Sequence, residues 1–464
     1  MLKQSGAVTC HSADLNLLNL VKFQFFIGAV LSMANLTAAG TQSETIRAML
    51  TTLHENGQFS GSILVARNGM VIYCDAFGTG AGSSTMNQPE TPSNLASVSK
   101  QFTAMAVMML AERGRIQYDD PISTYLPRLA DSSVGMTVRH LLTHTSGIPD
   151  VGDLGIDRPN LKESEVVKAV IKQHAQFAEP GQKYRYSNTG YILLGMIVEK
   201  VTDLPLDVFL ARNIFEPLGM TSTRLSSRRG YTKGDGGIIS TVDDLLKWDQ
   251  ALYTERLVKQ ATLNEAFTPA RVQEGTSTYG FGWNIAEKDG DKFVWHTGNT
   301  AQFRAFIGRR LGERLFIAIL TNKGNSPRTE ICDAIVDILH EKPYTMPKLS
   351  IAMKITDVIK SRGVEAGIQE YRRLKATQAQ TFDFSERELN SLGYQLLNQG
   401  EKQAAVRIFE LNTMEFPTSS NTYDSLGEAY SKIGQKERAI QAYTKAVELD
   451  PNNLNSRRML RKLK

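Results

Sequence analysis

The C-terminal part of the chain repeats itself with a period of 34 residues. Five positions recur in register: Leu392, Gly393, Ala405, Phe409 and Pro417 are followed 34 residues later by Leu426, Gly427, Ala439, Tyr443 and Pro451. A unit this short cannot bury its own apolar face and must stack on its neighbours. The period therefore predicts two stacked helical hairpins, at about residues 385–418 and 419–452.

The spacing and the residue types resemble the tetratricopeptide repeat, in which two antiparallel helices pack small residues at their crossing and a proline ends the unit. Gly367 and Tyr371 lie 38 residues before Ala405 and Phe409, which places a degenerate first hairpin at about 351–375. That gives the three units needed for a stable stack. We expect an all-α repeat whose concave surface binds a protein or peptide partner.

The charge distribution argues against a nucleic-acid partner. Lys and Arg number 53 and Asp and Glu 48, a net charge of +5, and the last fourteen residues, 451–464, hold five basic side chains and no acid. A nucleic-acid-binding protein carries its basic patch on the folded body. We interpret the basic end as the solvated face of a helix that caps the repeat domain at 351–464, which a linker at 341–350 joins to the rest.

The N-terminal residues 1–40 resemble a signal peptide. From Phe23 to Ser43 there is no charged residue, and the apolar run 25–31 lies inside this stretch. The small residues Ala38 and Gly40 suit the −3 and −1 positions of a processing site. We expect export to a periplasmic or extracellular location, with a membrane anchor formed by the N-terminal segment as the alternative.

Three cysteines, Cys10, Cys74 and Cys332, are too few for a disulfide framework and lack the CxxC spacing of zinc or redox sites. Cys10 lies in the expected leader. A bridge between Cys74 and Cys332 requires Cα atoms within about 7 Å of each other, which the sequence leaves open.

Residues 44–340 carry strand-like segments at both ends and helical patterns between them. Asn68-Gly69 separates two short apolar stretches and is the strongest hairpin signal of the chain. Further strand-like segments lie at 293–295, 303–307 and 315–320, and helical patterns at 100–112, 192–201, 243–253 and 329–340. These features predict one α+β domain, with an antiparallel sheet closed by N- and C-terminal pairing, flanking helices and an inserted helical region.

Ser97 and Lys100 stand one helical turn apart at the start of an amphipathic helix. A serine hydroxyl is a poor nucleophile until a neighbour takes its proton, and a desolvated lysine can be that base. The helix N-terminus adds free N–H groups and positive potential where an oxyanion would form. Taken alone, however, such a serine is more often an N-cap than a nucleophile.

Two further motifs follow in order, Tyr186-Ser187-Asn188 before a helical run and His296-Thr297-Gly298 at the end of an apolar strand. They are accompanied by LLTHTSGIP at 141–149, FEPLGM at 215–220 and GGIIST at 236–241. Together these motifs resemble the serine β-lactamase and penicillin-binding-protein superfamily, specifically its class C β-lactamase, D-aminopeptidase and esterase branch. The resemblance covers about residues 44–340 and implies a β-lactamase-like fold.

The resemblance also implies roles for individual residues. Ser97 attacks a carbonyl to form an acyl-enzyme while Lys100 and Tyr186 shuttle the proton, the Asn188 amide holds the substrate, and the backbone N–H groups of Ser97 and Asn299 form the oxyanion hole. A tyrosine, with an unperturbed pKa of about 10, is a base near neutral pH only beside a cation such as Lys100. We therefore expect an exported serine hydrolase of an ester, peptide or β-lactam carbonyl that uses no cofactor. The alternative is a non-catalytic scaffold with a pseudo-hydrolase domain.

His296 departs from the lactamase-type motif, which has lysine in Lys-Thr-Gly, and with Thr297 and Gly298 it is expected to bind the substrate. Because histidine is mostly neutral at pH 7, an esterase or D-peptidase is favoured over an efficient β-lactamase. The position of His296 predicts a ring at the mouth of the acyl site, where an imidazolium would bind a substrate carboxylate. A neutral ring hydrogen-bonded to Thr, Tyr or backbone is the alternative. Trp295 is expected on the opposite face of the strand.

His140 and His144 are four residues apart and could share a helix face as metal ligands. Leu141, however, occupies the position where a zinc protease needs glutamate. We therefore expect no metal site, and we interpret residues 141–149 as a buried helix end followed by a turn.

Overall fold

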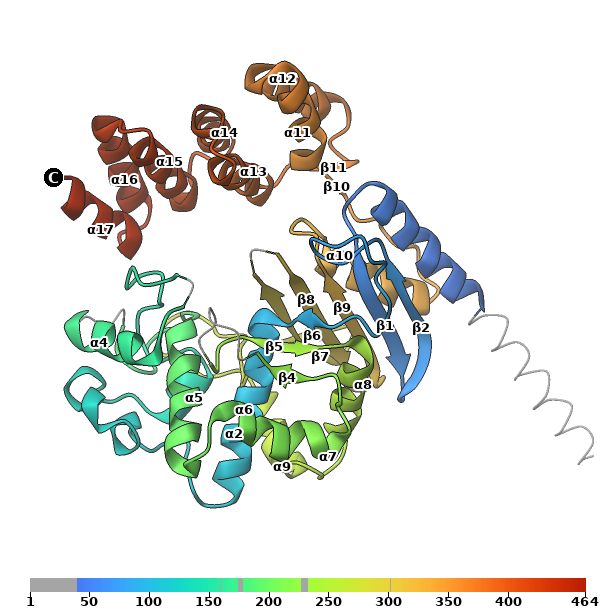
Figure 1. The fold of residues 1–464 in the computed structure, drawn as a ribbon, viewed down its shortest axis with the longest axis vertical. Helices are drawn as coiled ribbons and strands as arrows, with labels where there is room; N and C mark the ends of the chain where they lie inside the picture. The colour runs from blue at the N-terminus through green and yellow to red at the C-terminus, as the bar shows by residue number, and fades with distance from the viewer. Residues whose placement is uncertain (1–39, 159, 174–177, 227–232, 301) are drawn as a thin grey trace, which may run out of the picture.

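A computed structural model describes residues 40–158, 160–173, 178–226, 233–300 and 302–464. The expected signal or anchor segment lies almost entirely outside these residues. Figure 1 shows two parts, a mixed domain at residues 40–340, here called the N-terminal domain, and a helical tail at residues 351–464. None of the described helices is long and apolar enough to cross a membrane.

A six-stranded antiparallel sheet forms the centre of the N-terminal domain, in the order β2-β1-β9-β8-β7-β6. Its strands are β1 (Gly61–Arg67), β2 (Met70–Phe77), β6 (Asn284–Lys288), β7 (Asp291–Asn299), β8 (Arg304–Arg310) and β9 (Leu315–Thr321). Asn68 and Gly69 both have positive φ, 52° and 77°, as a two-residue type I′ hairpin requires. β1 pairs with β9 from Gly61 opposite Thr321 to Arg67 opposite Leu315, which confirms that the two ends of the domain share one sheet.

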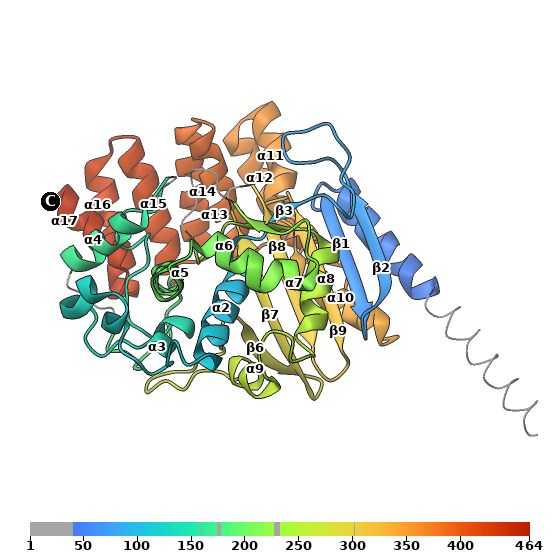
Figure 2. The same cartoon turned by 60° about the horizontal axis from the view of Figure 1, so that its bottom comes forward.

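Helices cover both faces of this sheet (Figures 1 and 2). Ile63 and Val65 of β1 pack into the core formed with the helix at 40–55 and with α10 (Arg328–Leu339). Leu64 and Ala66 point to the larger core on the other face, as the two-residue side-chain period of a strand requires. That core includes α2 (Lys100–Glu112), α5 (Asn188–Thr202) and α8 (Val242–Ala251).

The inserted helical region lies between β2 and β6. Its remaining helices are α3 (Val138–Leu142), α4 (Glu163–Gln173), α6 (Leu206–Leu210), α7 (Glu216–Leu218) and α9 (Gln260–Ala266). A small sheet of β3 (Ser93–Asn94), β5 (Ile238–Ser240) and β4 (Arg224–Leu225) lies within it. Thr241 caps α8 by accepting a hydrogen bond from the Asp244 N–H at 3.3 Å. The α+β fold expected from the sequence is confirmed.

The tail consists of stacked helical hairpins. They are α11 (Ile351–Arg362) with α12 (Val364–Thr377), α13 (Glu386–Asn398) with α14 (Lys402–Glu415), and α15 (Ser420–Lys432) with α16 (Lys436–Leu449), followed by α17 (Leu454–Leu463). The repeated glycines lie at the helix crossings: a Cβ atom on Gly393 would be 2.5 Å from Phe409 Cζ, and one on Gly427 2.8 Å from Tyr443 Cδ1. The 34-residue period thus places a glycine of one helix against an aromatic ring of the next.

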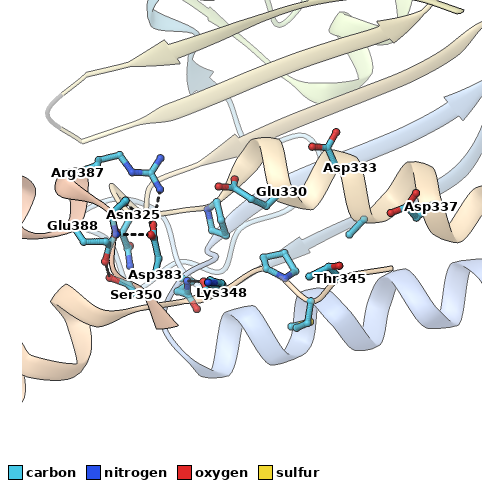
Figure 3. A pocket seen from close by; sticks show the side chains of 16 residues that line it. Asn325, Glu330, Asp333, Asp337, Thr345, Lys348, Ser350, Asp383, Arg387 and Glu388 are labelled. Carbon is cyan, nitrogen blue, oxygen red and sulfur yellow. Dashed lines mark hydrogen bonds and ion pairs between the residues drawn. The ribbon is translucent and has the colours of Figure 1, made fainter. Parts of the chain in front are cut away.

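A cavity of about 680 Å³ lies where the tail joins the N-terminal domain. Figure 3 shows Glu330, Asp333 and Asp337 of α10 along this cavity and Asp383 and Arg387 of the tail at its end. Its lining includes none of the expected catalytic residues. The cavity therefore belongs to the joint between the two parts rather than to the site described below.

The two described cysteines do not form a bridge. Cys74 in β2 is partly buried, Cys332 in α10 is buried, and both are free thiols. Burial raises the pKa of Cys74 to about 11 and that of Cys332 further still. Cys10 lies outside the described residues. Neither described thiol is ionised near neutral pH.

Candidate active site

Ser97 and Lys100 are in direct contact. Ser97 is partly buried in the 3₁₀ turn η1 (Ala96–Ser99), directly before α2. Lys100 is fully buried, and its Nζ donates to Ser97 Oγ at 3.2 Å, to Asn188 Oδ1 at 2.8 Å and to the Asp235 carbonyl at 2.7 Å. These acceptors match the three N–H donors of an ammonium group. The lysine is thereby held with its Nζ against the serine hydroxyl.

The turn that carries Ser97 is fixed by its neighbours. Ala96 has a φ of 48°, a left-handed conformation that is uncommon outside glycine, and its N–H donates to Asn94 Oδ1 at 2.7 Å. Strand β7 passes so close that a Cβ atom on Gly298 would lie 2.0 Å from the Leu95 carbonyl oxygen. Glycine at position 298 thus allows the end of β7 to lie directly against the serine turn.

Tyr186 and Asn188 approach Lys100 from a different segment of the chain. Lys100 Nζ lies 5.0 Å from the centroid of the Tyr186 ring. Asn188 is the first residue of α5, and its side chain accepts from Lys100 through Oδ1 and donates to Asp150 Oδ2 through Nδ2 at 3.4 Å. The structure therefore brings Ser97, Lys100, Tyr186 and Asn188 together, and the Asn188 amide contacts Lys100 and Asp150.

His296 is buried rather than exposed at the mouth of the site, so the expectation of an imidazolium that binds a carboxylate is wrong. The residue is 3% exposed, with Nδ1 2.6 Å from the Thr297 carbonyl oxygen and Nε2 2.8 Å from Tyr279 Oη. Because a carbonyl only accepts, Nδ1 carries the proton and Nε2 accepts from the tyrosine. Burial, together with the nearby Lys100, lowers the pKa of His296 to about 3. The ring is neutral at pH 7.

His144 is a second neutral imidazole in the same cluster. Its Nδ1 accepts from the Ser187 N–H at 3.1 Å, and its ring centroid lies 4.2 Å from that of Tyr186 and 4.6 Å from that of Tyr279. Burial lowers the pKa of His144 well below its usual value and raises that of Tyr279 well above its own. His144 and Tyr279 are therefore uncharged rings beside Tyr186.

His140 and His144 have different surroundings. His140 Nδ1 accepts from the Thr137 N–H at 3.2 Å and helps to cap α3, whereas His144 lies in the buried cluster. In the part of the chain that the structure describes, no group of three His, Cys, Asp or Glu side chains could hold a metal ion.

The end of β7 is held by an arginine that the sequence analysis did not identify. Arg328, the first residue of α10, donates from Nη1 to the carbonyls of Gly298 at 2.8 Å and Ala305 at 2.7 Å, and from Nη2 to Asn299 Oδ1 at 2.9 Å. Burial lowers the pKa of Arg328 to about 10, so it remains charged at pH 7. Asn299 is exposed and Thr297 partly buried. Arg328 thus fixes the strand end that lies against the serine turn.

Two carboxylates were also missed. Asp150 Oδ1 accepts from the Asn188 backbone N–H at 2.5 Å, and Asp153 accepts from Arg185 Nη2 at 2.8 Å. Asp150 directly follows the LLTHTSGIP stretch, which was the one available signal. The pair anchors the Tyr186 segment on both sides.

Trp295 lies on the opposite face of β7, as expected. Its ring stacks on Phe293 with a centroid distance of 5.1 Å and an angle of 11°, next to the core formed with α10. The alternation along β7 therefore directs His296 toward the serine turn and Trp295 away from it.

The site combines the Ser97 hydroxyl, the buried Lys100 side-chain nitrogen and the Tyr186 phenol at the N-terminal end of a helix. Such an arrangement suits nucleophilic attack on a carbonyl, because the base is in contact with the nucleophile and backbone N–H groups are available for an oxyanion. Comparison with known proteins agrees with this chemistry. Residues 46–340 match the family model described as Beta-lactamase, and residues 420–453 match the one described as Tetratricopeptide repeat.

The chain belongs to the β-lactamase family. It is 31% identical over 354 residues to "Penicillin-binding protein 4*" of Bacillus subtilis, covering 65% of this chain and 77% of that protein. The octameric penicillin-binding protein homologue from Pyrococcus abyssi is similar in structure, with a TM-score of 0.58 and 26% identity over 70% of this chain and 81% of that one. D-amino acid amidase from Ochrobactrum anthropi shares the fold, with a TM-score of 0.56 and 22% identity over 65% and 99% of the two chains. The family and the tail repeat expected from the motifs are confirmed.

Proposed function

We propose that this member of the β-lactamase family hydrolyses an ester or amide bond through an acyl-enzyme on Ser97. The observation that carries the proposal is the 3.2 Å contact between Ser97 Oγ and Nζ of the fully buried Lys100. In this step one member of the Lys100–Tyr186 pair has given up its own proton, and the pair takes the hydroxyl proton as Oγ attacks the carbonyl and returns it to the leaving group. A water molecule, deprotonated by the same pair, then attacks the acyl carbonyl; the acyl-serine bond breaks, the pair passes the proton to Ser97 Oγ, and the acid is released.

The remaining site residues hold the carbonyl. Backbone N–H groups of Ser97 and Asn299 stabilise the oxyanion, since the Gly298 contact with Leu95 sets the end of β7 beside the serine turn. Asn188 positions Lys100 through its carboxamide oxygen and holds the substrate. Thr297 and Gly298 line the same strand end.

Esters and D-amino acid amides or peptides are the favoured substrates, ahead of β-lactams. The lactamase-type motif has a permanent lysine charge where this chain has the neutral His296. A related fold belongs to a D-amino acid amidase. The uncharged rings of His144, Tyr279 and His296 lie buried beside Tyr186 and offer no cation to a substrate carboxylate.

The test is covalent labelling with a fluorophosphonate and with a fluorescent penicillin. Wild-type protein should be labelled by at least one probe, and Ser97→Ala by neither. Lys100→Met keeps most of the side-chain volume and removes the ammonium group, and Tyr186→Phe removes the phenol. Each should lower ester turnover by a factor comparable to that of Ser97→Ala, and the double variant should be no worse, because members of one catalytic unit are not additive.

Circular dichroism first establishes that each variant is folded. Undiminished labelling of Ser97→Ala would show that the probes react at a residue other than Ser97, and no labelling of folded wild-type protein by either probe would favour the non-catalytic scaffold. A competitive screen of simple esters, D-Ala-D-Ala peptides and a chromogenic cephalosporin then ranks the substrates.

We also propose that the chain is exported and that the tail binds a protein or peptide. The uncharged stretch 23–43 supports export, and N-terminal sequencing of secreted or periplasmic protein should give a start near Thr41. A start at Met1 in a membrane fraction would instead indicate an anchor. The stacked hairpins support a peptide partner, which a pull-down with the full chain can identify.

A further inference from the structure

One turn of the N-terminal domain holds the Tyr186 segment on both sides. Residues 150–156, here called the 150–156 turn, are closed by hydrogen bonds from the Leu154 N–H to the Asp150 carbonyl at 2.9 Å and from the Ile156 N–H to the Val151 carbonyl at 3.1 Å. Within it, Asp153 pairs with Arg185, directly before Tyr186, at 2.8 Å, and Asp150 accepts from the Asn188 N–H, two residues after Tyr186, at 2.5 Å. A shift of the turn would therefore move Tyr186 relative to Lys100.

The last helix of the tail contacts this same turn. Gly155 has a φ of 69°, and a Cβ atom on it would lie 1.7 Å from Nη1 of Arg458 in α17. The guanidinium group thus occupies the space that a side chain at position 155 would fill. Figures 1 and 2 both show α17 beside the segment that leads into α4.

Arg458 is itself fixed to the body of the tail. Its Nη2 donates to Asn455 Oδ1 at 2.8 Å, and Asn455 Nδ2 donates to Asp424 Oδ2 of α15 at 2.9 Å. Ser456 also donates to Asp424. The guanidinium group is therefore presented by the stacked hairpins and is not a loose surface side chain.

We propose that the docked tail positions the catalytic residues: Arg458 holds the 150–156 turn through Gly155, and the turn holds Tyr186 and Asn188. This inference rests on the proposed function for its kinetic consequences. Arg458, Asp150 and Asp153 are positioning residues, because they act through Tyr186 and Asn188 rather than on the substrate. A ligand that draws α17 away from the turn would lower turnover, so ligand binding to the tail would change the activity of the N-terminal domain.

The experiment compares Arg458→Ala with Arg457→Ala, a matched variant of an exposed arginine one residue earlier. Arg458→Ala should lower kcat for a small ester about threefold to tenfold, with KM changed less than twofold, as expected for a coupling of this kind. Arg458→Lys should restore part of kcat, and Arg457→Ala should match wild type. Thermal unfolding should be unchanged in all three.

A second pair of variants tests the other side of the contact. Gly155→Ala introduces a Cβ atom that displaces Arg458, whereas Gly82→Ala introduces one at an equally left-handed glycine with nothing within 4 Å. Only the first should lower kcat. Wild-type kcat in both Arg458→Ala and Gly155→Ala, or an equal loss in Arg457→Ala, would overturn the proposal.

Hydrogen exchange separates this proposal from the proposed function, because it needs no activity. The Asn188 N–H donates to Asp150, so exchange in the peptide 184–190 should be faster in Arg458→Ala than in wild type and in Arg457→Ala. Unchanged exchange overturns the coupling even if Ser97 proves catalytic. Faster exchange in a chain without Ser97-dependent hydrolysis would support the coupling and reject only the enzyme.

Discussion

Acid sensitivity of the N-terminal domain should depend on His296. In the folded chain its pKa is lowered to about 3, because the ring is buried near Lys100. The unfolded imidazole has a pKa of about 6.5. Between these two values the unfolded state binds a proton that the folded state excludes, so stability falls as the pH falls from about 6.5 towards 3. Above pH 6.5 the residue contributes no pH dependence.

The size of the effect follows from the two pKa values. At pH 5 the unfolded imidazole is about 1.5 pH units below its pKa, and about 1.4 kcal/mol per unit gives about 2 kcal/mol of lost stability. His296→Gln replaces the ring by a side chain that cannot be protonated and that still offers an acceptor to Tyr279. Its stability should therefore drop about 2 kcal/mol less than that of wild type between pH 7 and pH 5.

Urea unfolding followed by tryptophan fluorescence measures this difference. Trp248, Trp283 and Trp295 are the only tryptophans, and all lie in the N-terminal domain, so the tail does not contribute to the signal. Comparing the two pH values within each protein cancels any pH-independent cost of the substitution. From pH 7 to pH 8 the two proteins should behave alike. An equal loss of stability in both on going to pH 5 would refute the neutral, buried His296.

Three further predictions concern one buried ion pair and two glycines in close contact with their neighbours. Asp249→Asn should lower the free energy of unfolding by about 3–5 kcal/mol in the same urea assay. Asp249 and its partner Arg309 are both fully buried, with Oδ1 and Nε 2.5 Å apart. A loss below about 1 kcal/mol would contradict a buried ion pair shielded from solvent. Gly298→Ala should abolish ester hydrolysis while leaving the tail folded, because its Cβ would lie 2.0 Å from the Leu95 carbonyl oxygen. Gly236→Ala is the matched control and should remain active, because its Cβ would lie 3.8 Å from the Ala96 carbonyl oxygen. Gly427→Ala should lower the thermal midpoint of the tail by circular dichroism, since overpacking against Tyr443 costs roughly 1–3 kcal/mol; an unchanged midpoint would contradict the close packing of Gly427 on that ring.

Much of the fold was predictable because its signals are local. Asn68-Gly69 fixes a hairpin through the backbone of two residues, Ser97 and Lys100 meet because they are one helical turn apart, and the period of the tail sets glycine against an aromatic ring. In each case the sequence spacing is also the spatial relation.

The supporting residues of the site were not predictable in this way. Asn188 is hydrogen-bonded to Asp150, 38 residues away in the sequence, and Asn299 to Arg328, 29 residues away. No sequence period relates such positions. For His296 the sequence left two alternatives, an imidazolium that binds a carboxylate and a neutral hydrogen-bonded ring, because the charge state depends on burial and the sequence does not show how closely Tyr279 and Lys100 enclose the ring.

The pairing of β1 with β9 constrains the order in which a newly made chain can fold. β1 and β2 leave the ribosome early, but the inner edge of β1 remains without a partner until residues 315–321 have been synthesised. Contacts between such distant segments form slowly, and an unpaired edge strand invites association with other chains. Fragments that end before Leu315 should therefore aggregate. The tail, built from neighbouring hairpins, is synthesised only after all strands of the sheet have been made.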